Sequence, residues 1–251
     1  MSHLIPLALA LLVAGTPVAE PPLPTAKDIT SHMDRLYRAD SSYARLVMDI
    51  KTTHFERSLE LESWSRGKDQ SVAVIRKPAR EAGTATLRNK DGMWNYAPRA
   101  DRLMRVPTAL LADSWMGSHL TNDDLMQESS WEDDYDSTVR WFDNKGTREL
   151  QLVSIPKKDA AVVYSKVVMA LNPEGLVPLR TEYYDGDEVV RTFLYEEPRK
   201  FGDQMIPTVM RIVPVDKPEE RTVVTYKELK FDIKVSDSLF TARGLRKAAR
   251  K

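Results

Sequence analysis

Residues 82–125 read AGTATLRNKDGMWNYAPRADRLMRVPTALLADSWMGSHLTNDDL, and this stretch decides the fold class. Asp91 and Gly92 form a tight-turn signal between two alternating runs, which predicts a β-hairpin. A crossover rich in methionine and tryptophan follows, and Thr121 with Asp124 makes a capping-box start for a helix. The stretch has no nucleophile elbow, metal-ligand spacing or phosphate loop. It therefore indicates a place that holds an apolar molecule rather than a place for chemistry.

Seven side chains are candidates for lining or gating such a cavity. Trp94 and Tyr96 lie on one face of the second hairpin strand, because side chains alternate along a strand. Methionine is soft and adaptable, and a well-specified core seldom needs much of it. These aromatic and methionine side chains could line a cavity or fill an ordinary core, and the residues alone support both interpretations about equally. The candidates are Trp94, Tyr96, Met104, Trp115 and Met116, with Leu179 and Tyr183 on an opposing strand.

Outside this stretch the chain predicts one helix followed by strands. Thr25 and Asp28 form a capping-box start for an amphipathic helix that runs to about Ala39. Turn signals roughly every 8–12 residues are then typical of an antiparallel sandwich or barrel. The predicted strands beyond the hairpin are Tyr43–Phe55, Ser58–Gly67, Ser71–Arg76, Thr138–Asp143, Glu149–Ile155, Val162–Leu171, Val177–Tyr184, Glu188–Glu196, Met205–Val213 and Thr222–Phe231. We expect a mainly β protein of about ten or eleven strands, as a single domain over residues 20–251.

The N-terminus carries an export signal pattern. Residues 4–14, LIPLALALLVA, have the length of a secretory apolar segment and are too short to span a bilayer. Cleavage is expected after Ala19, so residues 1–19 are interpreted as a signal peptide. A buried N-terminal helix is the alternative, and Pro17 and Pro21 disfavour it. The expected location is the periplasm.

Composition excludes several classes of function. Lysine plus arginine and aspartate plus glutamate number 37 each, so no overall field favours nucleic acid. The absence of cysteine excludes disulfides and a lipobox anchor. No histidine has zinc-ligand spacing, and we expect no metal and no cofactor. A hydrolase is the least supported class, because no catalytic triad can be assembled.

Three polar clusters have a simpler interpretation than a site. His119 and Asp124 could form an acid–base pair, but a polar loop beside a helix cap explains them as well. The acidic residues 131–136 could bind calcium, but they lack the glycine and alternation of a calcium loop. The basic residues 243–251 could contact an anionic membrane or an acidic partner, although a frayed terminus is more common.

Two segments resemble the outer-membrane lipoprotein-sorting protein family, relatives of the periplasmic lipoprotein carrier LolA. The first is GTATLRNKDGMWNYAPRADRLMRVP at residues 83–107, followed by SWMGSHLTNDDL at 114–125. The second is GLVPLRTEYYDGDEVVRTFLYEEPRKFGDQMIPTVMRI at residues 175–212. The resemblance implies an unclosed, strongly curved antiparallel β-barrel wrapped over helices, with a helical lid over an apolar cavity. It also implies a basic residue on an early strand that helps control opening, for which Arg45 and Arg57 are positional candidates.

Two functions follow as hypotheses. The favoured one is a periplasmic carrier that binds lipoprotein acyl chains or a free lipid and shuttles it toward the outer membrane. Such a carrier would receive its cargo from an inner-membrane exporter and deliver it to an outer-membrane acceptor. The alternative is a sensor or interaction module that uses the same curved sheet to bind a protein partner.

Overall fold

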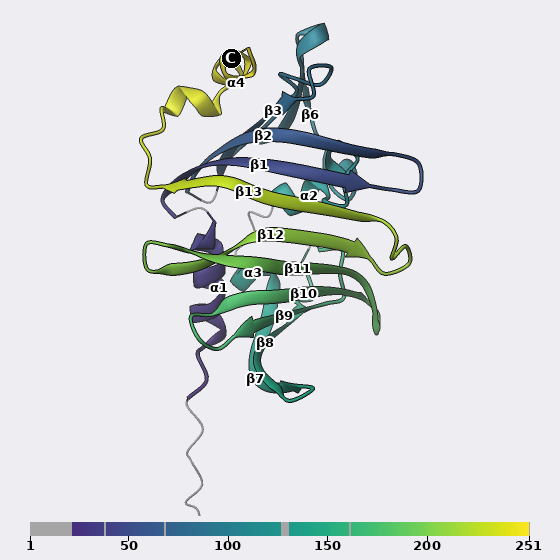
Figure 1. Cartoon of the computed structure of the whole chain (residues 1–251), viewed down its shortest axis with the longest axis vertical. Helices are drawn as coiled ribbons and strands as arrows, with labels where there is room; N and C mark the ends of the chain where they lie inside the picture. The colour runs from purple at the N-terminus through teal and green to yellow at the C-terminus, as the bar shows by residue number, and fades with distance from the viewer. Residues whose placement is uncertain (1–21, 38, 68, 127–130, 161, 251) are drawn as a thin grey trace, which may run out of the picture.

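Thirteen strands form one antiparallel sheet in the computed structural model, which describes residues 22–37, 39–67, 69–126, 131–160 and 162–250 (Figure 1). Their order across the sheet is β6-β5-β4-β3-β2-β1-β13-β12-β11-β10-β9-β8-β7, so β6 and β7 are the two edges and the sheet is not closed. The strands are β1 (Ser41–Lys51), β2 (Glu56–Arg66), β3 (Gln70–Lys77), β4 (Ala85–Asn89), β5 (Gly92–Ala97), β6 (Arg102–Arg105), β7 (Tyr135–Asn144), β8 (Thr147–Pro156), β9 (Lys166–Asn172), β10 (Val177–Asp185), β11 (Glu188–Phe201), β12 (Gln204–Pro214) and β13 (Arg221–Phe231).

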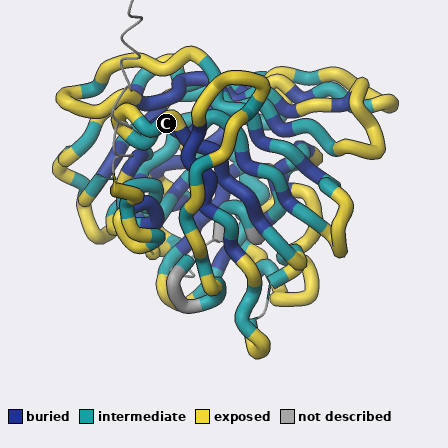
Figure 2. The backbone as a smooth tube through the Cα atoms, turned by 90° about the horizontal axis from the view of Figure 1, so that it is seen from below, coloured by how far each residue is buried: buried dark blue, intermediate teal, exposed yellow. Residues whose placement is uncertain are grey.

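The predicted unclosed, mainly β architecture is confirmed, whereas the predicted count of ten or eleven strands is too low. The hairpin at Asp91 and Gly92 forms as expected from β4 and β5. A further strand, β6, pairs with β5 through only four residues, which is too short a run for an alternation to show. Figure 2 shows that burial is concentrated along the strands and that the turns at their ends are exposed.

Helix α1 (Ala26–Leu36) packs against one face of the sheet (Figure 1). Its predicted capping box is confirmed, since Thr25 accepts from the Asp28 backbone N–H and the Asp28 carboxylate accepts from that of Thr25. Ile29 is fully buried against strands β8 and β9, and Leu36 is buried against β1, β12 and β13. The helix therefore bridges two parts of the sheet that curve toward each other.

The predicted helical lid is mostly not helical. The crossover segment (residues 106–126) contains the 3-10 turns η2 (Thr108–Leu110) and η3 (Trp115–Gly117) and only one short helix, α2 (Asn122–Met126). Helix α3 (Trp131–Asp134) follows before β7. Pro107 has no backbone N–H, and Met116 and Gly117 both have positive φ, 52° and 67°. A continuous helix cannot form through these residues.

The C-terminus also departs from expectation. Residues 242–249 form helix α4 (Ala242–Ala249) after the 3-10 turn η4 (Asp237–Phe240), so the predicted frayed tail is wrong up to Arg250. Leu245 is fully buried, and Phe240 is 2% exposed, against strands β3, β4 and β5. Because Val72 and Val74 face α4 while Ala73 faces the main core, α4 covers the opposite face of the sheet from α1.

No helix in the described part of the chain is long and apolar enough to cross a bilayer. The predicted signal peptide at residues 1–19, with its cleavage point after Ala19, lies outside the described residues.

Candidate functional site

Three cross-strand rows on the concave face of the sheet define where a cavity can form. From the β2–β3 turn inward, the rows across β1, β2 and β3 are Ser42–Ser65–Ser71, Ala44–Ser63–Ala73 and Leu46–Leu61–Ile75. The first two rows consist of serine and alanine, so their side chains leave space above the sheet. The third row is bulky and closes that space. Side-chain volume thus changes from small to large along the strand direction.

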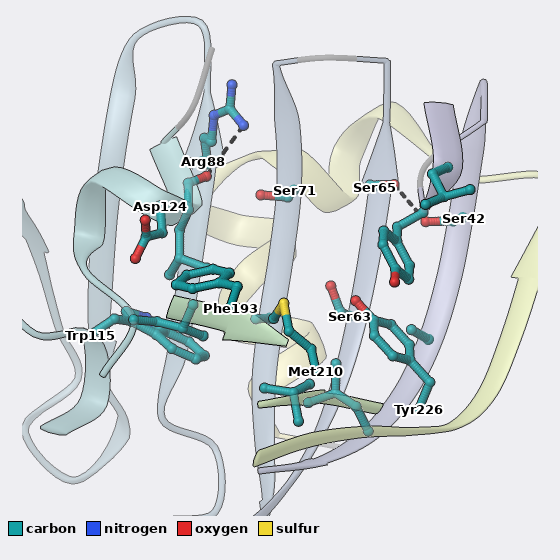
Figure 3. A pocket seen from close by; sticks show the side chains of 18 of the residues that line it. Ser42, Ser63, Ser65, Ser71, Arg88, Trp115, Asp124, Phe193, Met210 and Tyr226 are labelled. Carbon is teal, nitrogen blue, oxygen red and sulfur yellow. Dashed lines mark hydrogen bonds between the residues drawn. The ribbon is translucent and has the colours of Figure 1, made fainter. Parts of the chain in front are cut away.

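A cavity of about 390 Å³ lies over the small rows, within the range of roughly 300–1,000 Å³ that is usual for ligand sites. Its other walls are large apolar and aromatic side chains from the crossover segment and from strands β9 to β13 (Figure 3). These walls include Trp115, Leu120, Met169, Tyr183, Phe193, Tyr195, Met210, Val224 and Tyr226, and Met33 and Leu36 of α1 with its C-cap residue Tyr37 also line the cavity. Burial raises the pKa of Tyr183 and of Tyr195, so both phenols stay uncharged.

The cavity is polar at one end and apolar at the other. Gly67, which is exposed, and Gln70 line it at the β2–β3 turn, so the cavity reaches the surface there. Figure 3 shows Ser65 and Ser71 at one level of the cavity and Trp115 at a lower level. The hydroxyl groups therefore lie toward the mouth, and the depth of the cavity is apolar.

Hydrogen bonds fasten the crossover segment over this cavity. The Trp115 indole Nε1 donates to Thr86 Oγ1 at 3.0 Å, and Arg88 Nη1 donates to the Leu125 carbonyl at 3.3 Å. The Arg57 guanidinium on β2 donates to the Met116 carbonyl and pairs with Glu81.

Of the two arginines considered from the sequence, Arg57 therefore contacts the crossover segment. The side chain of Arg45 is 56% exposed and lies 3.9 Å from Glu228 on β13. A role of either arginine in opening stays a prediction.

A buried ion pair joins the crossover segment to β11. Arg191 Nη1 and Nη2 donate to the two carboxylate oxygens of Asp124 at 2.7 and 2.9 Å. Burial by itself lowers the pKa of Arg191, but the Asp124 carboxylate outweighs it and the pKa is raised. The guanidinium also lies over the rings of Tyr183 and Phe193, 4.5 and 4.9 Å from their centroids. A bidentate pair between aromatic faces holds α2 in one position.

The His119 side chain belongs to a second polar network, and the His119 backbone carbonyl accepts from Arg191 Nη1 at 3.3 Å. Its ring Nδ1 lies 2.9 Å from Thr222 Oγ1 and its Nε2 lies 3.1 Å from Glu220 Oε2. Glu220 also accepts from the Thr53 backbone N–H at 2.9 Å. That bond first, and the His119 contact second, lower the pKa of Glu220 to about 2.

Asp124 does not pair with His119; it caps α2 by accepting from the Thr121 backbone N–H at 2.7 Å. The capping interpretation of this motif is confirmed. No group of three or more histidine, aspartate or glutamate residues in the described ranges could hold a metal ion.

The structure brings three of the seven predicted site residues to one place. Trp115 and Tyr183 line the cavity and are 5% and 6% exposed. Met116 is partly buried and packs against the same core cluster. Their role in ligand binding stays a prediction.

The other four lie elsewhere. Trp94 and Tyr96 point to the opposite face of β5, into the cluster beneath α4, whereas their neighbour Met93 lines the cavity. Met104 is 45% exposed on the edge strand β6. Leu179 is the extra residue of a β-bulge between Pro178 and Arg180, which turns Pro178 rather than Leu179 toward the cavity.

Sequence reasoning missed the residues that create the space. Ser63, Ser71, Ala44 and Ala73 form no motif, and bulky side chains are the usual signal for an apolar site. A signal was nevertheless present, because small residues recur at every second position at 42 and 44, at 63 and 65, and at 71 and 73. Such a run on adjacent strands predicts a hollow beside the sheet.

An unclosed antiparallel sheet that curves around an apolar cavity, with helix α1 on its concave side, is a LolA-like fold. The match to a putative outer membrane lipoprotein-sorting protein domain from Vibrio parahaemolyticus has a TM-score of 0.74 at 19% identity and covers 88% of this chain and 98% of that one. A LolA superfamily protein from Nitrosomonas europaea matches with a TM-score of 0.72 at 23% identity, over 87% and 98% of the two chains. The predicted resemblance is therefore confirmed, and these two matches concern the fold.

The chain belongs to the family whose model, described as uncharacterized protein, matches residues 67–247. A DUF1329 family protein from Desulfovibrio piger is similar in structure, with a TM-score of 0.77 at 26% identity over 88% of this chain and 97% of that one. Comparison with curated proteins gave no match.

Proposed function

We propose that this protein is a periplasmic carrier that holds one hydrophobic chain in the cavity and moves it toward the outer membrane. The observation that carries the proposal is the cavity of about 390 Å³ between the small rows of β1–β3 and the aromatic wall. The lipoprotein-sorting name of a structural relative supports the same reading. The apolar segment at residues 4–14 supports export to the periplasm.

Burial of a chain gives enough free energy for capture. Each CH₂ group that leaves water contributes about 0.8 kcal/mol, so a sixteen-carbon acyl chain offers on the order of 10 kcal/mol before ordering costs. Release requires a partner that binds the chain or favours an open form, because a ligand leaves only when the equilibrium shifts. An inner-membrane donor and an outer-membrane acceptor are the partners that the proposal needs. No catalytic step is part of it.

A cavity-filling variant tests the proposal. Ala44 is 6% exposed and lies in the second small row, where it lines the cavity, so Ala44→Phe occupies the space that a chain would take. Ala82→Phe is the matched control, because Ala82 is exposed in the turn before β4. The measurement is native mass spectrometry of each protein from its own periplasm, followed by lipid extraction.

We expect the wild type and the control Ala82→Phe to carry the same amount of bound lipid. Ala44→Phe should carry little or none. Circular dichroism and thermal unfolding must show that Ala44→Phe is folded; if it is not, Ala73→Leu places a smaller obstruction in the same row. Wild-type protein without lipid that also fails to take up an added apolar dye would refute the carrier.

A further inference from the structure

The serines that line the cavity differ in their hydrogen bonds, and Ser63 lies one row deeper than Ser65 and Ser71. Ser42 Oγ and Ser65 Oγ are buried and bond to each other at 2.7 Å. Ser63 and Ser71 also line the cavity, and within the described residues neither hydroxyl has a protein partner. A hydroxyl donates one hydrogen bond and accepts two, so these groups face the cavity with unused capacity.

Ser63 and Ser71 are placed to contact one small polar head. Ser71 pairs with Ser65 across β2 and β3, so Ser63 and Ser71 are diagonal neighbours on one face. Such neighbours lie about 7–8 Å apart. A head with two hydroxyl groups on adjacent carbons spans that separation with one hydrogen bond to each serine. A bare hydrocarbon would leave both serines without partners.

The charged side chains in the lining do not favour a charged head. Asp34, Arg88 and Asp124 line the cavity, and Arg88 lies opposite Ser71 across β3 and β4. The Asp124 carboxylate is paired with Arg191, so that pair carries no net charge, and Asp34 and Arg88 leave one charge of each sign in the lining. A buried charge without a counter-charge is costly, whereas an uncharged polar head needs only hydrogen bonds.

The direction of the ligand follows from the order of the rows. Hydroxyl groups lie near the mouth, and Leu46, Leu61 and Met48 lie at depth. A chain that enters tail first buries its apolar part against these residues and leaves its head beside water and serine. The reverse direction would bury the head among apolar groups without hydrogen bonds.

We propose that the cargo is a single-chain amphiphile with an uncharged, hydroxyl-bearing head, held with this head at Ser63 and Ser71 and its tail toward Trp115. The inference rests on the proposed carrier function and names its ligand class. One chain is specified because the cavity of about 390 Å³ is at the small end of ligand sites.

The chemistry of the head group is tested by displacing the apolar dye N-phenylnaphthylamine from delipidated full-length protein. The competitors share a ten-carbon chain and differ in charge: 1-decanoylglycerol, decanoate and decyltrimethylammonium. We expect 1-decanoylglycerol to compete best. The double variant Ser63→Ala with Ser71→Ala removes two hydroxyl groups and leaves the apolar lining intact. Its affinity for 1-decanoylglycerol should fall by about 10-fold, because two hydrogen bonds of modest strength are lost. Dye binding should not change, and Ser58→Ala on the exposed face of β2 is the control.

The direction is tested by quenching of tryptophan fluorescence by bromine, which acts at contact distance. The glycerol ester of 10-bromodecanoate should quench the fluorescence of Trp115, and the ester of 2-bromodecanoate should not. The contribution of Trp115 is the difference between the wild type and Trp115→Phe. Equal quenching by the two bromo esters would overturn the inferred direction. Tighter binding of decanoate or of decyltrimethylammonium, or equal competition by all three amphiphiles that Ser63→Ala with Ser71→Ala leaves unchanged, would overturn the inferred head group. In each case binding of the dye would still support the carrier function. Failure of the wild type to bind the dye at all would refute the carrier itself.

Discussion

Asp124 and Arg191 form a bidentate ion pair in which each side chain is only 8% exposed. The two residues come from elements far apart in the chain, α2 and β11. Asp124 also caps α2, because its carboxylate accepts from the Thr121 backbone N–H and its own N–H donates to Thr121 Oγ1. One carboxylate thus fixes both the start of α2 and its position over the cavity.

Asp124→Ala is expected to destabilise the protein by about 3–5 kcal/mol, since it leaves the Arg191 charge buried without its partner. Urea unfolding at neutral pH measures the change. Asp187→Ala removes an exposed carboxylate from the β10–β11 turn and should stay within about 0.5 kcal/mol of wild type. A loss for Asp124→Ala no larger than that of the control would contradict a buried pair.

The double variant Asp124→Leu with Arg191→Met separates charge from packing. Replacing both partners by apolar residues removes the desolvation cost along with the attraction, so the double variant should be more stable than Asp124→Ala. Its crossover segment is nevertheless expected to open more often, which amide hydrogen exchange at residues 115–125 would report. Slower exchange there than in wild type would argue against a fastening role for the pair.

Local patterns predicted most of the elements, but not which face of a strand lies inside. Alternation correctly places Trp94 and Tyr96 together, and only tertiary packing decides that their face lies under α4. At Leu179, a bulge changes the phase of the alternation, and the neighbouring Pro178 is the local signal, because proline within a sheet occurs at edges, strand starts or bulges. Short capped elements such as α2 were visible through Thr121 and Asp124 because their signal is local.

Trp115 should matter for ligand binding, whereas Trp94 should matter for the stability of the fold. Trp115→Phe changes a cavity wall and loses the hydrogen bond to Thr86, so we expect weaker binding of N-phenylnaphthylamine by several-fold. Trp94→Phe changes the cluster beneath α4 and should lower stability with dye affinity unchanged. Dye titration and urea unfolding of both variants provide the comparison. Loss of dye binding in Trp94→Phe at retained stability would show that the ligand site lies on the outer face.

Acidification should weaken the network at Glu220. The pKa of this carboxyl is lowered to about 2, from an ordinary value of 4.5, so its ionised form stabilises the folded state. The contribution is complete above pH 4.5 and is lost as pH falls from there toward 2. Glu220→Gln removes the titration, so the stability gap between wild type and variant should be widest near neutral pH and shrink below pH 4.5. A gap that is constant from pH 7 to 3 would show that Glu220 acts through packing alone.

Helix α4 is expected to be part of the folded core despite its basic, C-terminal sequence. Leu245 is fully buried against β3–β5, so Leu245→Ala should cost about 2–5 kcal/mol, as for other buried leucines. Arg243→Ala is the control on the exposed side of the same helix. A second variant acts through the backbone, since a Cβ at Gly244 would lie 1.8 Å from the Ser238 carbonyl oxygen. Gly244→Ala must therefore displace α4 from η4, and unfolding by urea should show a loss comparable with that of Leu245→Ala. Wild-type stability in both variants would mean that α4 does not pack on the sheet in solution.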